Sequence, residues 1–234
     1  MCVIFACKIK KPSPKDLFLG EKVNPDGAGI AWVRGKTVYW KKNLKASDIV
    51  KLLPKVNLPL VIHFRLASVG GGSSSLCHPF PITKDVPLSL EGKIKGSVLA
   101  HNGTWLEWRK ICFQILLRKN IRCPDGLWSD SRAMAWIAAH YGIGVLHFIG
   151  EKVAVLSPKG LKIFGTGWEL YNGMLVSNTH FLHSPKSWDF QSWDFQLGQK
   201  SCEVLDKKEV YPFGNKEVVY GEDKKNFADG RSSL

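Results

Sequence analysis

Short apolar runs separated by turn-forming residues dominate the first hundred residues of the chain. Residues 3–7 are apolar throughout, and residues 28–42 hold two β-rich runs around a glycine, which predicts a hairpin. The run 59–68 is apolar and ends in polar residues, and 96–103 is a short apolar segment that runs into a glycine. These patterns predict short buried strands joined by turns.

The pattern changes to helical spacing after residue 103. Residues 104–120 place large apolar side chains three and four positions apart, and Thr104 with Glu107 has the spacing of a capping box, which predicts a helix over this range. Residues 129–142 begin with serine and aspartate and stop at Gly142, which predicts a second helix.

Apolar runs typical of strands then resume. We expect strands within 144–150, 152–157, 161–165 and 173–178. A block of helices between two blocks of strands indicates an α+β protein with mainly antiparallel sheets.

The character of the sequence changes again near residue 184. A five-residue unit is duplicated in SWDFQSWDFQ at 187–196, which is too few copies for a repeat architecture. The repeated aromatics either pack on a surface or stack on bases or a partner. We therefore expect one domain over 1–184 and a polar C-terminal extension over 185–234.

Composition places the chain among ordinary globular proteins. It has 234 residues, 44% of them hydrophobic, and no apolar stretch long enough to cross a bilayer, so we expect no membrane association. The N-terminus does not have the pattern of a signal peptide. None of the six cysteines forms a CxxC pair, which argues against a structural zinc site and favours free thiols in the cytoplasm.

The chain is basic, with a formal net charge of +13. Residues 200–234 hold seven basic and seven acidic side chains, so the excess lies in 1–199. Such a body attracts nucleic acid, an acidic partner or an anionic substrate, unless the charges only solvate the surface.

The second residue is the first candidate for chemistry. If Met1 is removed, Cys2 carries a thiol and a free α-amine on one residue. The amine of such a residue has a reference pKa near 8, and it can accept the thiol proton directly or through a water. The alternative is that Cys2 only packs.

Three other segments end strands or begin a helix with polar residues. Arg65 stands at the end of the buried strand predicted within 59–68, where a guanidinium can hold a carboxylate through two hydrogen bonds. Asn102 and Gly103 together offer an amide and a backbone N–H suited to an oxyanion hole. Asp130, at a helix start, can bind an ammonium group, although such residues are usually caps.

In this order the motifs resemble the class II glutamine amidotransferase family of N-terminal-nucleophile (Ntn) hydrolases. The matching pieces, over roughly 2–180, are MC, NPDGAGIAW, HFRLAS, CHPFP, LAHNG and the SDS helix start, and they look most like the small stand-alone members. The resemblance implies a four-layer αββα sandwich and an enzyme without a metal or organic cofactor.

The resemblance also implies residue roles. Cys2 would be the nucleophile and its α-amine the base, attacking the side-chain amide of glutamine or a γ-glutamyl compound. Asn102 and Gly103 would hold the oxyanion. The substrate-binding set would be Arg65 for the α-carboxylate, Asp130 for the α-ammonium, and Ser68 and His101.

Two departures and two alternatives accompany this hypothesis. Arg132 stands where many relatives carry an acidic residue, and Ser68 stands where threonine is common. The extension is too short for a synthase domain, so ammonia would pass to a separate partner enzyme. The alternatives are a silent Ntn-like scaffold that binds nucleic acid or protein, and an amide hydrolase for a non-glutamine acyl group.

Overall fold

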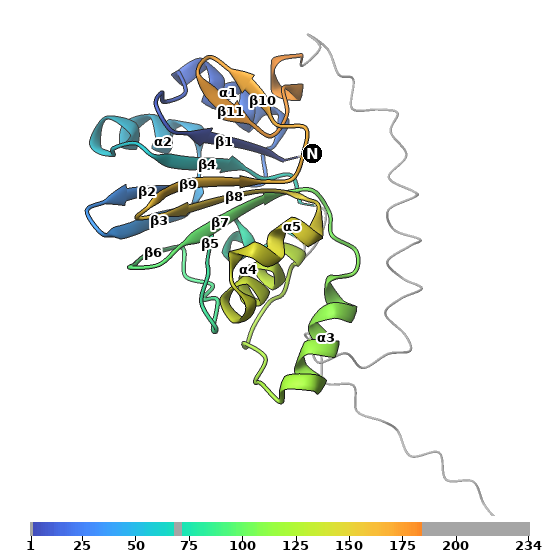
Figure 1. Cartoon of the computed structure of the whole chain (residues 1–234). Coiled ribbons are helices and arrows are strands. Elements are labelled where there is room, and N and C mark those ends of the chain that lie inside the picture. Colours follow the sequence, from blue (N-terminus) through green and yellow to red (C-terminus); the bar gives the residue numbers. More distant parts are fainter. Residues whose placement is uncertain (1, 68–71, 184–234) are drawn as a thin grey trace, which may run out of the picture.

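A computed structural model describes residues 2–67 and 72–183 of the chain. Two antiparallel sheets lie face to face within these residues, and helices cover their outer faces (Figure 1). No helix in the described part is long and apolar enough to span a bilayer. The extension 185–234 with its SWDFQ repeat lies outside the described residues, so its predicted role is not tested.

The larger sheet has seven strands in the order β10-β11-β1-β4-β2-β3-β6, all of them antiparallel to their neighbours. Its strands are β1 (Val3–Cys7), β2 (Ala28–Arg34), β3 (Thr37–Leu44), β4 (Leu60–Phe64), β6 (Glu91–Ile94), β10 (Glu169–Tyr171) and β11 (Met174–Val176).

The smaller sheet has four strands in the order β5-β7-β8-β9, also antiparallel. Its strands are β5 (Phe80–Pro81), β7 (Val98–Asn102), β8 (Lys152–Ser157) and β9 (Gly160–Phe164). The α-helices are α1 (Pro14–Val23), α2 (Ala46–Leu52), α3 (Trp108–Lys119), α4 (Asp130–Tyr141) and α5 (Leu146–Ile149), and the 3₁₀ helices are η1 (Leu53–Lys55), η2 (Ser74–Leu76), η3 (Ile143–Val145) and η4 (His180–Leu182).

Alternation along the strands builds three hydrophobic layers between the four structural layers. In β1, Val3 and Phe5 pack with α1 and α2 on one face, whereas Ile4 packs with the smaller sheet on the other. In β7, Ala100 faces the larger sheet and Leu99 packs with α4. The predicted αββα sandwich of mainly antiparallel sheets is therefore confirmed.

The predicted hairpin at 28–42 is confirmed as β2 and β3, and the helix at 129–142 as α4. The helices α1 and α2 were not expected in the first half. A capping box signals the first of them, because Ser13 accepts from the Asp16 backbone and Asp16 accepts from the Ser13 backbone.

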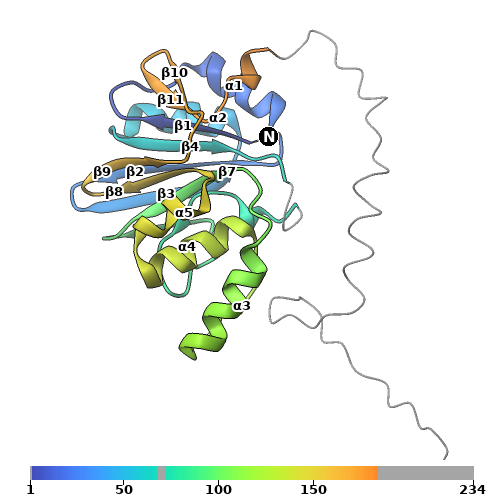
Figure 2. The same ribbon diagram turned by 45° about the vertical axis from the view of Figure 1, so that its right-hand side comes forward.

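The helix predicted over 104–120 begins later, at Trp108, and the proposed capping box is wrong. Glu107 stands at the N-cap without a side-chain capping bond. The backbone N–H of Trp105 instead donates to the Asp130 carboxylate at 3.1 Å, which holds the preceding residues outside the helix. Figure 2 shows α3 extending away from the sheets, whereas α4 lies against them.

The segment 144–150 is also helical, although a strand was predicted. It forms the end of η3 and the single turn of α5, bounded by Gly142 and Gly150. Both glycines have positive φ, 81° and 78°, which ends regular structure on either side of the run. A short apolar run does not by itself distinguish a strand from a buried helical turn.

Candidate active site

Cys2 lies immediately before β1, an interior strand of the larger sheet. Its half-buried thiol donates to the Leu66 carbonyl and accepts from the Leu66 N–H, both at 3.3 Å. Burial raises the pKa of the Cys2 thiol, and the hydrogen bond with Leu66 and the charge of Arg65 oppose this rise only in part. The thiol is therefore protonated at neutral pH, so a nucleophilic Cys2 needs a base.

Two polar residues after β11 hold the beginning of β1 in place. Ser177 is fully buried, and its hydroxyl accepts from the Ile4 backbone N–H at 2.9 Å. Asn178 donates from its side chain to the Cys2 carbonyl at 2.7 Å. We did not single out either residue from the sequence, although a polar pair at a strand end is the signal that drew attention to Arg65 and Asn102.

The NPDG turn positions the segment that carries Arg65. The Arg65 N–H donates to the Gly27 carbonyl at 2.9 Å, and the Arg65 carbonyl accepts from Asp26 at 3.0 Å. The Asp26 carboxylate accepts from the Ala67 N–H at 2.8 Å. Gly27 has a φ of 105°, which favours glycine. This motif thus fixes the backbone around Arg65 and Leu66.

The CHPFP motif crosses β2 at close range. A Cβ atom at Gly29 would collide with the carbonyl oxygen of His78, so only glycine fits there. His78 is buried and lies against His63, with ring centroids 4.0 Å apart. Burial, reinforced by neighbouring charges, lowers the pKa of His63 to about 3 and that of His78 well below its usual value, so both rings are neutral.

The end of β7 places three predicted residues in different directions. His101 is buried and its Nδ1 lies 2.9 Å from the Ser131 hydroxyl. Asn102 donates from its amide to the Ser177 hydroxyl at 2.8 Å, which uses one of its two N–H groups. A Cβ at Gly103 would collide with the Glu151 carboxylate, so Gly103 lets that loop approach closely.

The start of α4 presents Asp130 to the same region. Ser129 caps the helix, because its hydroxyl accepts from the Arg132 N–H at 3.1 Å. The Asp130 carboxylate accepts from the N–H groups of Trp105 and Ser131 at 3.1 and 2.8 Å, and it lies 3.9 Å from His101. Ser129 is thus the cap of α4, and the buried Asp130 carboxyl group connects the first turn of the helix with Trp105 and His101.

Arg132 does not alter the charge next to Asp130. Its guanidinium donates to backbone carbonyls on the opposite side of α4, those of Asp85, Val86, Asp125 and Leu127. Arg132 therefore connects α4 with the segments that contain Asp85 and Asp125.

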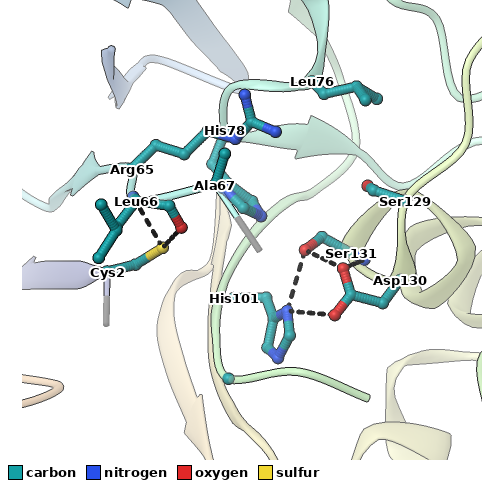
Figure 3. A pocket seen from close by; sticks show the side chains of 11 residues that line it. Cys2, Arg65, Leu66, Ala67, Leu76, His78, His101, Ser129, Asp130 and Ser131 are labelled. Atoms are coloured by element: carbon teal, nitrogen blue, oxygen red, sulfur yellow. Dashed lines mark hydrogen bonds and ion pairs between the residues drawn. The ribbon is translucent and has the colours of Figure 1, made fainter. Parts of the chain in front are cut away.

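One pocket brings most of the predicted residues together, as Figure 3 shows. Cys2 and Arg65 line one side, and His101 and Asp130 line the other. Gly103 also lines the pocket, whereas Asn102 is not part of its wall. Ser68 lies outside the described residues.

The pocket has the charges that an amino acid needs. A cation on one wall and an anion on the other suit a zwitterionic head group, and a thiol stands beside them. Arg65 also donates to the Ser73 carbonyl at 3.1 Å, which directs its guanidinium. No group of three histidine, cysteine or carboxylate side chains in the described residues has the geometry to hold a metal ion.

No protein-family model matches the chain, and no curated protein does. Solved structures share its fold, and two of them are described here. One is glutamine phosphoribosylpyrophosphate amidotransferase from B. subtilis complexed with ADP and GMP, with 13% identity and a TM-score of 0.50. The other is described as the allosteric regulatory enzyme of purine biosynthesis, with 15% identity and a TM-score of 0.50.

Each match covers 75% of this chain, and the chain spans only 41% of the length of either protein. At these identities the similarity concerns the fold. The chain therefore has the Ntn-hydrolase fold that the amidotransferases share.

Proposed function

We propose that this protein is an amide hydrolase of the class II glutamine amidotransferase type, which releases ammonia from glutamine or cleaves a γ-glutamyl amide. The observation that carries the proposal is the pocket in which Cys2 and Arg65 face Asp130 from the opposite wall. The fold that this protein shares with amidotransferases supports amide hydrolysis as the class of reaction.

In the proposed first step, removal of Met1 frees the α-amine of Cys2. The amine takes the thiol proton, and the Sγ atom attacks the amide carbon of the substrate side chain. The raised pKa of the thiol supports a mechanism in which proton transfer accompanies attack. The Gly103 N–H and the remaining amide N–H of Asn102 would stabilise the oxyanion.

In the second step the C–N bond breaks and the ammonium of Cys2 gives its proton to the leaving nitrogen. A γ-glutamyl thioester remains on Cys2. Water then attacks the thioester with the amine again as base, which releases glutamate and restores the thiol. Arg65 would hold the α-carboxylate throughout, and Asp130 the α-ammonium, with His101 and Ser68 completing the substrate-binding set.

The released ammonia would pass to a separate acceptor enzyme. A stand-alone γ-glutamyl amide hydrolase is the simpler form of the same proposal, in which no acceptor is needed.

The test is ammonia release from glutamine by the wild-type protein and by Cys2→Ala. We expect activity in the wild type and none above background in Cys2→Ala. Cys123→Ala is the matched control, because Cys123 is a half-buried thiol outside the pocket. Glutaminase activity that persists unchanged in Cys2→Ala would refute the proposal, and preferential hydrolysis of amides without an amino-acid head group would favour a different acyl substrate.

A further inference from the structure

A groove lies at the end of the larger sheet that is opposite to Cys2. The register pairs Val3 with Phe64 at the catalytic end and Cys7 with Leu60 at the other, and Trp32 of β2 also pairs with Leu60. In Figure 1 the turn of the β2–β3 hairpin and the N-terminus accordingly lie on opposite sides of the molecule. The groove has a volume of about 410 Å³.

An aromatic pair forms one wall of this groove. Trp32 and Tyr39 face each other across β2 and β3, with ring centroids 5.8 Å apart and planes inclined by only 14°. Both rings are half-buried. Trp32 packs against the layer beneath α1 and α2, so the pair is held rigidly while part of its surface remains accessible.

The other walls supply positive charge. Arg34 on the hairpin and Lys55 in η1 are exposed and line the groove, and no carboxylate lines it. Neither cation forms an ion pair within the described residues. The described residues contain 25 lysines and arginines and 11 carboxylates, so the surrounding field is also positive.

We propose that this groove binds single-stranded nucleic acid. A base would stack on the Trp32–Tyr39 pair, and Arg34 and Lys55 would neutralise neighbouring phosphates. Bases inside a duplex have no free face to stack on an aromatic side chain, so the groove fits a single strand. Lys36 in the hairpin turn is also exposed and lies beyond Arg34. It would provide a further positive charge for the phosphates of an oligonucleotide longer than one residue.

The first test measures binding of a fluorescent single-stranded RNA of about twelve nucleotides by anisotropy at several salt concentrations. Arg34→Gln/Lys55→Gln should lower the slope of log K against log salt by about 1.4, because two phosphate contacts are lost. The control variant Lys119→Gln/Lys159→Gln removes two exposed charges outside the groove. It should lower the slope by less than half of the decrease expected for Arg34→Gln/Lys55→Gln. Equal losses in both variants would show binding by overall charge and overturn the proposal.

The second test concerns stacking. Trp32→Leu should weaken binding roughly 5- to 150-fold, the range for loss of one stacked base. Because Trp32 also packs in the core, the wild-type protein is cross-linked in parallel to an oligonucleotide that carries 4-thiouridine, and the modified peptide is identified by mass spectrometry. We expect adducts within 32–39.

Adducts confined to other peptides would overturn the proposal, as would unchanged affinity in a folded Trp32→Leu protein. Two competitors test the kind of ligand. A duplex of the same sequence and free AMP should each compete at least tenfold more weakly than the single strand. AMP that competes as well as the oligonucleotide would replace the proposal with a mononucleotide site. None of these measurements depends on Cys2.

Discussion

Ser177 joins the two strands that carry the proposed nucleophile and oxyanion hole. Its hydroxyl accepts from the Ile4 N–H at 2.9 Å and from the Asn102 amide at 2.8 Å, and the side chain is fully buried. The substitution Ser177→Ala removes the acceptor but leaves both donors in place. We expect this substitution both to lower the free energy of unfolding and to disturb the proposed active site.

The magnitude follows from the two donors. A buried donor without a partner costs about 1–3 kcal/mol, and relaxation around a lost hydroxyl recovers some of this, so we expect a loss of about 2–4 kcal/mol. With a urea m-value of about 2 kcal/mol per molar, the unfolding midpoint should fall by about 1–2 M. Because Asn102 and the backbone after Cys2 lose their anchor, kcat should fall more than KM rises.

The assay is urea unfolding followed by glutaminase kinetics on the same variants. Ser177→Thr keeps the hydroxyl and should retain most of the stability. Ser157→Ala is the control, because the Ser157 hydroxyl accepts from the Lys159 N–H and donates to a carbonyl in a partly exposed hairpin turn. A Ser177→Ala protein that unfolds within about 0.5 kcal/mol of the wild type would refute this reasoning.

Three further predictions concern other parts of the account. Gly29→Ala should lower Tm by more than Gly144→Ala, because a Cβ at position 29 meets the His78 carbonyl whereas a Cβ at position 144 meets nothing within 4 Å; equal Tm shifts would show that the His78 backbone does not lie this close to β2. Burial holds the pKa of His63 at about 3, below the usual 6.5, so stability is complete above 6.5 and is lost as the pH falls toward 3. His63→Gln should reduce the slope of the unfolding free energy between pH 6 and 4 by about 1.4 kcal/mol per pH unit, and an unchanged slope would mean that His63 titrates normally. Arg65→Lys should raise KM for glutamine roughly tenfold without a similar change for 4-aminobutanamide, which lacks the carboxylate, and equal effects on both would remove Arg65 from carboxylate binding.

The residues of the proposed site were easier to predict from the sequence than the helices of the two outer layers. Arg65 and Gly103 are distant in the chain, yet both follow apolar strands and line the same pocket. Polar residues after apolar runs marked them only weakly, and the resemblance of the ordered motifs to the amidotransferase family was needed to select them. Asp130 was recognisable because a helix start limits where its side chain can lie. The roles of these residues remain predictions.

The parts that were predicted wrongly depend on contacts distant in sequence. Before α3, the Trp105 N–H donates to the carboxylate of Asp130, a residue 25 positions further along the chain, and no local pattern predicts this contact. Residues 146–149 form a helical turn between glycines, although their composition suits a strand. Ser177 follows an apolar strand, which is a local signal, but its partners on β1 and β7 are distant in sequence and no local pattern identifies them.

The central claim is that Cys2 is an N-terminal nucleophile for a glutamine-like substrate. Its most direct test is the intact mass of the purified protein before and after incubation with a glutamine-analogue electrophile, followed by peptide mapping. The account predicts a protein without Met1 that gains one adduct on Cys2 and loses its glutaminase activity in step with labelling. An active protein that retains Met1, or an inactivating adduct on another residue, would contradict it.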